Sequence, residues 1–329
     1  MRLLSTSYGR MATIFIGFAV VFGLTGLAVR WATAADAVSP VAAGALDTGQ
    51  QSLLVDAAWL AQRLESGETP VIVDLSAQDV YDAGHIPGAI HAWWQDAMDP
   101  FSESYGRTLR LAENPYTLPA YWPDLGATAG ETIVVYDNAG SEHAAWFVWA
   151  LRANGYPNAV ALDGGLAAWT GAGQPTSDAP AAPKAVATPE PSWDDAYTWD
   201  ASAAIATNQL RDTLDDPNLV IIDVRTPEQA RDTINDTVPL GSIPGSRSLP
   251  APFVMRPDGT FLTGDELTAG LAPLQLAPGN EIVVYGRFGI DTGRVWLALR
   301  LAGYDNVRVY DDGWQTWAST PDLPTAPLP

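Results

Sequence analysis

The sequence predicts an α/β protein with two tandem halves, each a mostly parallel sheet flanked by helices. Short, continuously apolar runs end in Asp or Tyr, which is typical of strands buried on both faces. Helical patterns alternate with these runs, as they do in α/β folds. The same landmarks return at nearly constant spacing further along the chain, which indicates an internal duplication.

The first group of elements consists of four strands, two in each half. The run Val71–Asp74 is matched by Val220–Asp223, and Ile133–Tyr136 is matched by Ile282–Tyr285. Both pairs are separated by the same 149 positions. Helical patterns follow the later strand of each half, over residues 144–151 and 294–301. In parallel sheets, ligands gather where such strands end and the next helix begins.

The domain boundaries follow from these repeats. We expect the first domain over residues 52–170 and the second over residues 192–325. Residues 171–191 between them are rich in Pro, Ala and Gly, so we expect an extended linker.

The pattern of residues 1–34 predicts a targeting segment that precedes the folded domains. Arg2 and Arg10 come before an uncharged apolar run at 11–29, and the small residues Ala32-Thr33-Ala34 follow, which is the order of a secretory signal peptide. The run could also form an apolar helix that spans a hydrocarbon layer of about 30 Å, so a retained membrane anchor is the alternative. In either case we expect the remaining chain to be extracytoplasmic, in a periplasm or at a cell surface.

Composition limits the possible functions. The chain of 329 residues is 47% hydrophobic with 13 tryptophans, enough for the cores of two domains. It carries 17 Lys and Arg against 38 Asp and Glu, a net charge of −21, which disfavours nucleic acid as a partner. The chain contains no cysteine, so disulfides, thiolate metal sites and thiol nucleophiles are excluded.

Several short motifs punctuate both halves in the same order. The first half carries the turn Gly84-His85-Ile86-Pro87-Gly88, the pair Gly155-Tyr156, and Asp163-Gly164-Gly165 followed by Trp169. The second half carries Asp223-Val224-Arg225, Gly241-Ser242-Ile243-Pro244-Gly245, Gly303-Tyr304, and Trp314 with Trp317. This ordered set resembles the rhodanese family, in the tandem form of thiosulfate and mercaptopyruvate sulfurtransferases.

The resemblance implies a catalytic loop, and this chain departs from it. Members of the family carry a Tyr-Cys-x-x-Gly-x-x-Ala loop in the second domain, whose cysteine takes up sulfur as a persulfide. Here Tyr285 is followed by Gly286, and the equivalent position of the first half is Asp137. Glycine has no side chain with which to attack sulfur, so we expect no catalytic residue in this chain.

The rest of the loop is a candidate anion cradle, because backbone N–H groups that converge at a helix start bind anions. Its residues are Gly286, Arg287, Phe288, Gly289, Ile290, Asp291 and Thr292. Arg287 could pair with an oxyanion, whereas Asp291 would repel one. The sequence leaves open whether Arg287 and Asp291 form a surface pair or belong to a retained ligand site.

Two functions remain for comparison. The first is a non-catalytic module that binds an anion or a protein, with a small sulfur oxyanion or a membrane-associated protein as partner. The second, implied by the resemblance, is a sulfurtransferase that takes thiosulfate or 3-mercaptopyruvate as donor. We expect no cofactor in either case.

Other candidate sites are weaker. Ser141 and His143, with Asp137 or Glu142, contain the ingredients of a hydrolytic triad, but groups this close along one loop rarely converge. The three histidines lack compact metal-ligand spacing, so we expect no metal site. We expect His85 to fix its turn, and Trp169 and Trp317 to pack in the cores.

Overall fold

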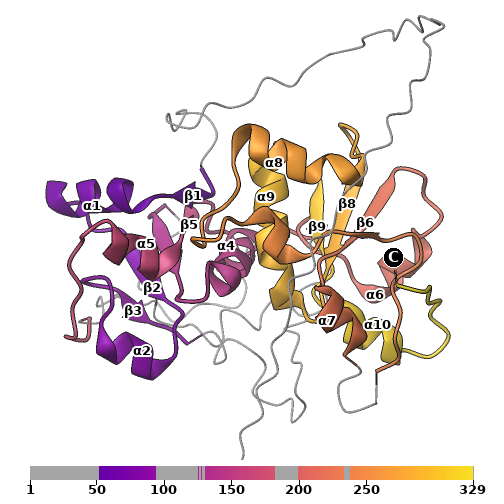
Figure 1. Ribbon diagram of the computed structural model, residues 1–329, viewed down its shortest axis with the longest axis horizontal. Helices are drawn as coiled ribbons and strands as arrows, with labels where there is room; N and C mark the ends of the chain where they lie inside the picture. The colour runs from indigo at the N-terminus through magenta and orange to yellow at the C-terminus, as the bar shows by residue number, and fades with distance from the viewer. Residues whose placement is uncertain are drawn as a thin grey trace, which may run out of the picture. The chain divides into compact units, whose positions relative to one another are not determined.

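The computed structural model describes residues 52–93, 125, 127, 130–181, 199–232 and 238–328, which form two α/β halves (Figure 1). This confirms the predicted fold class. The apolar run at 11–29 lies outside the described residues. Within the described ranges, no helix has the length and apolarity needed to cross a membrane.

The first half is built on a five-stranded sheet in the order β1-β5-β4-β2-β3, with every neighbouring pair parallel. Its strands are β1 (Leu54–Val55), β2 (Val71–Asp74), β3 (Ile90–His91), β4 (Ile133–Tyr136) and β5 (Ala159–Leu162). Its helices are α1 (Ala57–Ser66), α2 (Gln78–Ala83), α4 (Glu142–Ala153) and α5 (Gly165–Gly171). Alternate residues of β4 point to opposite faces, so Val134 packs with α1 and Trp169 of α5, and Val135 packs with α4.

The second half repeats this plan with a four-stranded parallel sheet in the order β7-β6-β8-β9. Its strands are β6 (Leu219–Asp223), β7 (Arg247–Ser248), β8 (Glu281–Tyr285) and β9 (Val307–Val309). Its α-helices are α6 (Thr207–Asp212), α7 (Pro227–Arg231), α8 (Gly264–Leu271), α9 (Gly293–Leu301) and α10 (Gly313–Ser319). The 3₁₀ turns are η1 (Ala251–Val254), η2 (Ala272–Leu274) and η3 (Gly289–Thr292). A single parallel bridge between Ala204 and Val309 replaces the β1–β5 pairing of the first half.

The predicted strands are confirmed almost to the residue. β2 and β4 have the predicted bounds, whereas β6 begins at Leu219 and β8 at Glu281. Trp169 and Trp317 are about fully buried, at 1% and 0% exposure, which confirms that they are core residues.

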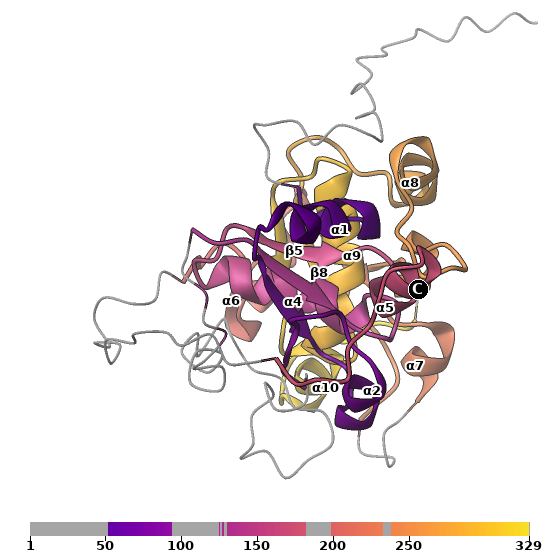
Figure 2. The same ribbon diagram turned by 90° about the vertical axis from the view of Figure 1, so that its left-hand side faces the viewer.

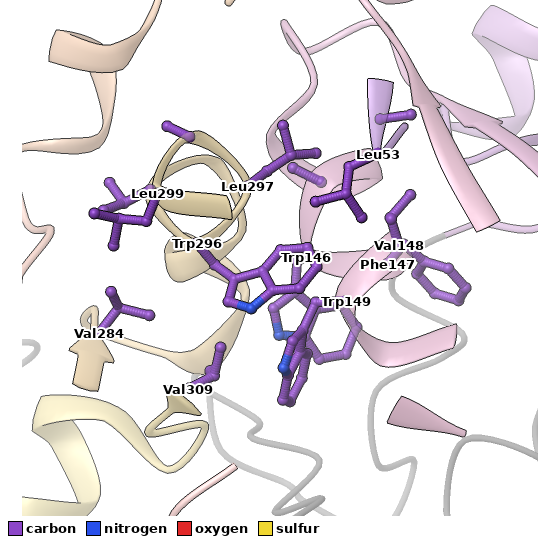
Figure 3. Close-up of a cluster of buried hydrophobic side chains, with 14 of the residues drawn as sticks. Leu53, Trp146, Phe147, Val148, Trp149, Val284, Trp296, Leu297, Leu299 and Val309 are labelled. Atoms are coloured by element: carbon purple, nitrogen blue, oxygen red, sulfur yellow. The ribbon is translucent and has the colours of Figure 1, made fainter. Parts of the chain in front are cut away.

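The two halves share one hydrophobic core, which α4 and α9 build where they pack together. Trp146 and Trp149 of α4 belong to the same buried cluster as Trp296 and Leu297 of α9 (Figure 3). Seen from the side of the first half, α4 lies in front of α9 (Figure 2), and the two helices contact each other. The carboxyl ends of β4 and β8 therefore feed into helices that contact each other.

In each half, the segment that follows the last helix folds back and pairs with the turn before the short edge strand. We call these segments straps; they are residues 172–181 in the first half and residues 324–327 in the second. In the first half, His85 and Ser177 form an antiparallel bridge, and Trp169 donates to Pro175 O at 2.8 Å. In the second half, Ser242 bridges to Ala326, and Trp317 donates to Pro324 O at 2.8 Å. Residues 172–181, which we expected to start an extended linker, thus pack on the first half.

His85 fixes the first strap. Its ring nitrogens lie 2.9 Å from Tyr81 O and 3.0 Å from Ala179 O, and its ring stacks on Tyr81 at 3.8 Å. These contacts join the turn at residues 84–88 to the strap, as the structural interpretation of His85 predicts.

Candidate functional site

Corresponding loops occupy the carboxyl ends of β4 and β8. The first runs from Asp137 to Ser141 into α4, and the second runs from Gly286 through η3 into α9. Because both helices lie in the interface, each loop lies close to the junction between the halves.

The first loop wraps around its own aspartate. Asp137 Oδ1 accepts from the backbone N–H groups of Ala139 and Ser141, each at 2.9 Å. Asp137 Oδ2 accepts from those of His143 and Ala144, also at 2.9 Å. The Asp137 residue is only 1% exposed. Four backbone N–H groups of this loop and of the start of α4 therefore point at the chain's own carboxylate.

The second loop is filled by a different aspartate. Asp291, in η3, places Oδ2 at 3.0 Å from the backbone N of Arg287 and at 3.3 Å from that of Phe288. In both halves, backbone N–H groups of the loop donate to a carboxylate. In the first half this carboxylate belongs to Asp137, the first residue of the loop, and in the second half it belongs to Asp291, near the end of the loop.

Gly286 leaves the room that Asp291 uses. A Cβ on residue 286 would lie 2.5 Å from the Asp291 Cβ, 2.8 Å from Phe288 O and 3.2 Å from Asp291 Oδ2. These separations are too short for a side chain at position 286 in the present loop. The present position of the Asp291 side chain therefore requires glycine at residue 286, which is the position of the family's cysteine.

The side chain of Arg287 forms an ion pair with Asp232. Its Nη2 lies 2.9 Å from Asp232 Oδ2, and its guanidinium lies 5.4 Å from the Phe288 ring centre. Arg287 thus contacts Asp291 through its backbone N–H group and Asp232 through its guanidinium. The remaining loop residues Gly289, Ile290 and Thr292 are buried, and Thr292 Oγ1 donates to Gly289 O at 2.5 Å.

Burial and a neighbouring acid perturb Asp291. Desolvation, followed by the charge of Glu142, raises the pKa of Asp291 to about 6, although hydrogen bonds from Phe288 and Arg287 oppose the shift. Glu142 comes from α4 of the first half and pairs with Arg294 of α9 at 3.2 Å. Arg294 also donates to Ala139 O at 2.6 Å and to Gly140 O at 3.1 Å, so the second half holds the first-half loop.

The residues of the possible triad do not assemble. Ser141 is fully buried and its Oγ has no hydrogen-bond partner. His143 Nδ1 lies 3.9 Å from Asp137 Oδ2, and burial lowers the pKa of His143. A serine hydroxyl without a base beside it is not activated for attack. Among the described residues, no cluster of three or more His, Asp or Glu is arranged to hold a metal ion.

Sequence reasoning missed the buried network beneath the second loop. Asp223 accepts from Arg225 Nε at 2.9 Å and from Arg225 Nη2 at 2.6 Å, and Tyr285 donates to the same carboxylate at 2.8 Å. Arg225 Nη2 also reaches Gly241 O at 2.8 Å. The signal was the Asp-x-Arg spacing after β6. In the first half Ser76 takes the place of the arginine.

The two parallel sheets and the closing straps define a tandem α/β protein. The family model for the rhodanese-like domain matches residues 56–172 and again residues 206–320. The chain therefore belongs to the rhodanese-like family and contains two such domains in tandem.

Similar proteins agree with this assignment. The chain is 27% identical over 287 residues to the sulfur carrier protein TtuD of Thermus thermophilus, covering 83% of this chain and 96% of that protein. It is 29% identical over 282 residues to a thiosulfate sulfurtransferase of Corynebacterium glutamicum, covering 82% and 89%.

Solved structures show the same fold. An anaerobic ergothioneine biosynthesis enzyme from Chlorobium limicola superposes with a TM-score of 0.72 at 22% identity, covering 85% of this chain and 72% of that chain. The crystal structure of YnjE gives 0.70 at 23% identity, covering 84% and 68%. The present chain contains no cysteine.

Proposed function

We propose that this protein is a non-catalytic member of the rhodanese-like family that acts as a binding module outside the cytoplasm. The observation that carries the proposal is the Asp291 carboxylate on the loop N–H groups beside Gly286. The position that the family reserves for a nucleophile has no side chain, and its surroundings already hold an acid.

The chemistry supports this proposal. A persulfide forms when a thiolate attacks the outer sulfur of a donor and keeps it covalently. Neither half offers a thiolate, because the chain has no cysteine. A carboxylate in each cradle would also repel the anionic donors thiosulfate and 3-mercaptopyruvate.

The filled cradles favour a protein partner at neutral pH. Asp137 takes four N–H groups and Asp291 takes two, so a free anion would have to displace a tethered one. A tethered group competes at a high effective concentration. We therefore propose a membrane-associated protein as the partner at neutral pH, with a small sulfur oxyanion as the second kind of ligand.

The location rests on residues 1–34, with their basic start, apolar run and small-residue triplet. Fractionation of cells that express the full chain, followed by N-terminal sequencing, tests it. We expect the protein outside the cytoplasm, either cut near Ala34 or retained in the membrane. Recovery of intact chain from the cytoplasm alone would contradict the proposed location.

Thiocyanate formation tests whether the protein transfers sulfur from a donor to cyanide. The purified protein is supplied with cyanide and either thiosulfate or 3-mercaptopyruvate, with the Corynebacterium glutamicum thiosulfate sulfurtransferase as positive control. We expect thiocyanate only at the rate seen without protein. A clear rate above that background would instead establish the sulfurtransferase alternative by a route that needs no cysteine.

A further inference from the structure

We propose that the first domain holds a small monovalent cation, of the sodium or potassium kind, in a buried site lined by oxygens of Asp74 and Ser76. At the corresponding position of the second domain, the guanidinium of Arg225 pairs with a buried carboxylate. The proposal is independent of the binding function proposed above, because it involves neither the loop after β4 nor the loop after β8.

Asp74 and Asp223 occupy equivalent positions in the two domains. Each is the last residue of a central strand, β2 in the first half and β6 in the second. Asp74 Oδ1 accepts from the backbone N–H group of Ser76 at 2.8 Å, and Asp223 Oδ1 accepts from that of Arg225 at 3.1 Å. The same local turn therefore follows both strands, and the side chains of residues 76 and 225 start from equivalent points.

In the second domain, a cation balances the buried carboxylate. Arg225 Nη2 lies 2.6 Å from Asp223 Oδ2, and both side chains are almost fully buried. The same nitrogen donates to Gly241 O at 2.8 Å, and Tyr285 donates to Asp223 Oδ2 at 2.8 Å. One positive charge thus matches the single negative charge, and both carboxylate oxygens accept hydrogen bonds.

In the first domain, the same carboxylate is buried without a side-chain cation. Asp74 is 0% exposed, and no cationic side chain among the described residues pairs with it as Arg225 pairs with Asp223. Its Oδ2 has no hydrogen-bond partner, and neither has Oγ of Ser76, which is 2% exposed. A buried carboxylate without a counter-charge is costly, so a positive charge from solution would stabilise this half.

The central tyrosines of the two sheets differ in the same sense. Burial, followed by the charge of Asp223, raises the pKa of Tyr285, and the charge of Arg225 opposes this shift. Burial, followed by the charge of Asp74, raises the pKa of Tyr136, and no cation among the described residues opposes that shift. The surroundings of Asp74 are therefore more negative than those of Asp223.

The available ligand atoms suit a monovalent ion. Asp74 Oδ2 and Ser76 Oγ are both oxygens, and hard cations prefer oxygen ligands. Gly84 O corresponds to the acceptor Gly241 O, because the two glycines begin equivalent turns with φ of 153° and 145°. A divalent ion would need more acidic ligands, and the described part of the chain has no cluster of three or more acidic or histidine side chains suited to a metal.

The size of the neighbouring side chains favours an ion over a larger group. Tyr81 of α2 stands 149 positions before Ala230 of α7, its counterpart in the second half. Burial and, more weakly, the charge of Asp74 raise the pKa of Tyr81, which places this larger side chain near the carboxylate. Ser76 is in turn much shorter than Arg225. A bare sodium or potassium ion is smaller than a guanidinium group and so fits this combination.

Thermal unfolding of the full chain in neutral detergent tests the proposal. It is followed by circular dichroism in sodium chloride, potassium chloride or N-methyl-D-glucamine chloride at equal ionic strength. A cation that binds only the folded protein raises its Tm. In about 0.1 M of the preferred alkali salt, we expect a Tm about 2–4 °C higher than in N-methyl-D-glucamine chloride. The salt that gives the larger increase identifies the ion.

The variants separate this site from the general effect of cations on an acidic protein. Asp74→Asn removes the charge and Ser76→Ala removes the hydroxyl ligand, so each should lose most of the Tm increase. Asp163→Asn is the matched control. It removes another carboxylate of the first domain, which follows β5, two strands away from β2 in the sheet. This control should keep the wild-type increase.

Equal wild-type Tm values in the three salts would overturn the proposal, and this is the result expected if Asp74 takes up a proton or binds only water. An undiminished increase in Asp74→Asn would also overturn it, and Ser76→Ala carries the same comparison if Asp74→Asn does not fold. Loss of the increase in Asp163→Asn as well would assign it to the overall negative charge. The experiment measures neither turnover nor anion binding, so its result leaves the proposed function untouched.

Discussion

The carboxylate of Asp291 occupies the space that a side chain on residue 286 would need, since a Cβ on Gly286 would lie 2.5 Å from the Asp291 Cβ. The two residues therefore constrain each other. A nucleophile cannot be restored at position 286 by a single substitution unless the loop also moves.

This constraint predicts the behaviour of an introduced thiol. In Gly286→Cys we expect a thiol pKa at or above the ordinary value of about 8.5, because Asp291 repels the thiolate and keeps its N–H donors. In Gly286→Cys with Asp291→Gly, those donors are free and the thiol pKa should fall below that value. The pH dependence of alkylation by iodoacetamide measures both.

The alkylation signal is unambiguous because the wild-type chain has no cysteine and serves as the blank. Equal thiol pKa values in the single and double variants would mean that Asp291 does not control this position.

The buried pair Asp223–Arg225 predicts a large loss of stability on truncation. Its two side chains are 3% and 1% exposed and lie 2.6 Å apart. Arg225→Ala leaves Asp223 buried without its cation, so the free energy of unfolding should fall by about 3–5 kcal/mol. Urea unfolding followed by tryptophan fluorescence measures the change.

The control for this variant is Arg211→Ala, which removes an exposed pair with Asp212. Exposed pairs contribute little, so the midpoint of urea unfolding should stay close to that of the wild type. Similar losses in both variants would show that the buried pair has no special role.

Ser141 is a site where a substitution should stabilise the protein. Its φ of 62° lies in the left-handed region, and its buried hydroxyl has no partner. Ser141→Gly relieves both costs and should raise the free energy of unfolding by about 1 kcal/mol. The matched control is Ser66→Gly at the end of α1, where glycine should instead cost up to about 1 kcal/mol. A lower midpoint of urea unfolding for Ser141→Gly would contradict the prediction.

Stability should increase as the pH falls from about 7.5 to about 5, because two buried carboxyls together outweigh the opposite contribution of His143, whose pKa is lowered by burial. Burial raises the pKa of both Asp163 and Asp291 to about 6 in the folded protein, above the ordinary value of about 3.9. Each contribution is therefore fully present below about pH 4 and is lost as the pH rises through about 6. Thermal unfolding followed by circular dichroism should give a higher Tm at the lower pH.

Asp163→Asn combined with Asp291→Asn should flatten this dependence. Asp212→Asn should leave it unchanged, because hydrogen bonding and charge pairing with Arg211 lower the pKa of that exposed carboxyl, so it stays ionised throughout the window. A pH dependence of the double variant equal to that of the wild type would assign the effect to other groups.

The fold was predictable because it depends on local patterns. Continuous apolar runs ending at Asp74 and Asp223 mark buried parallel strands wherever they occur, and their repetition shows the duplication. The strap at residues 172–181 was not predictable in the same way. Its pairing with His85 depends on a contact between segments almost a hundred positions apart.

The site was predictable only in part. The motif order placed Gly286 and Asp137, because a missing residue within a recognisable series is visible in the sequence. That Asp291 fills the second cradle depends on the path of η3, and that Arg225 neutralises Asp223 depends on burial. Neither is encoded by a residue type alone, since an Asp six positions after a strand is usually solvated.

The shared core at α4 and α9 couples the stability of the two duplicated halves. If the chain were cut within the linker and the halves parted, Trp146, Trp149 and Trp296 would turn from core into wet surface. Each half therefore covers apolar surface of the other. A mutation that damages one copy is thereby felt by the other.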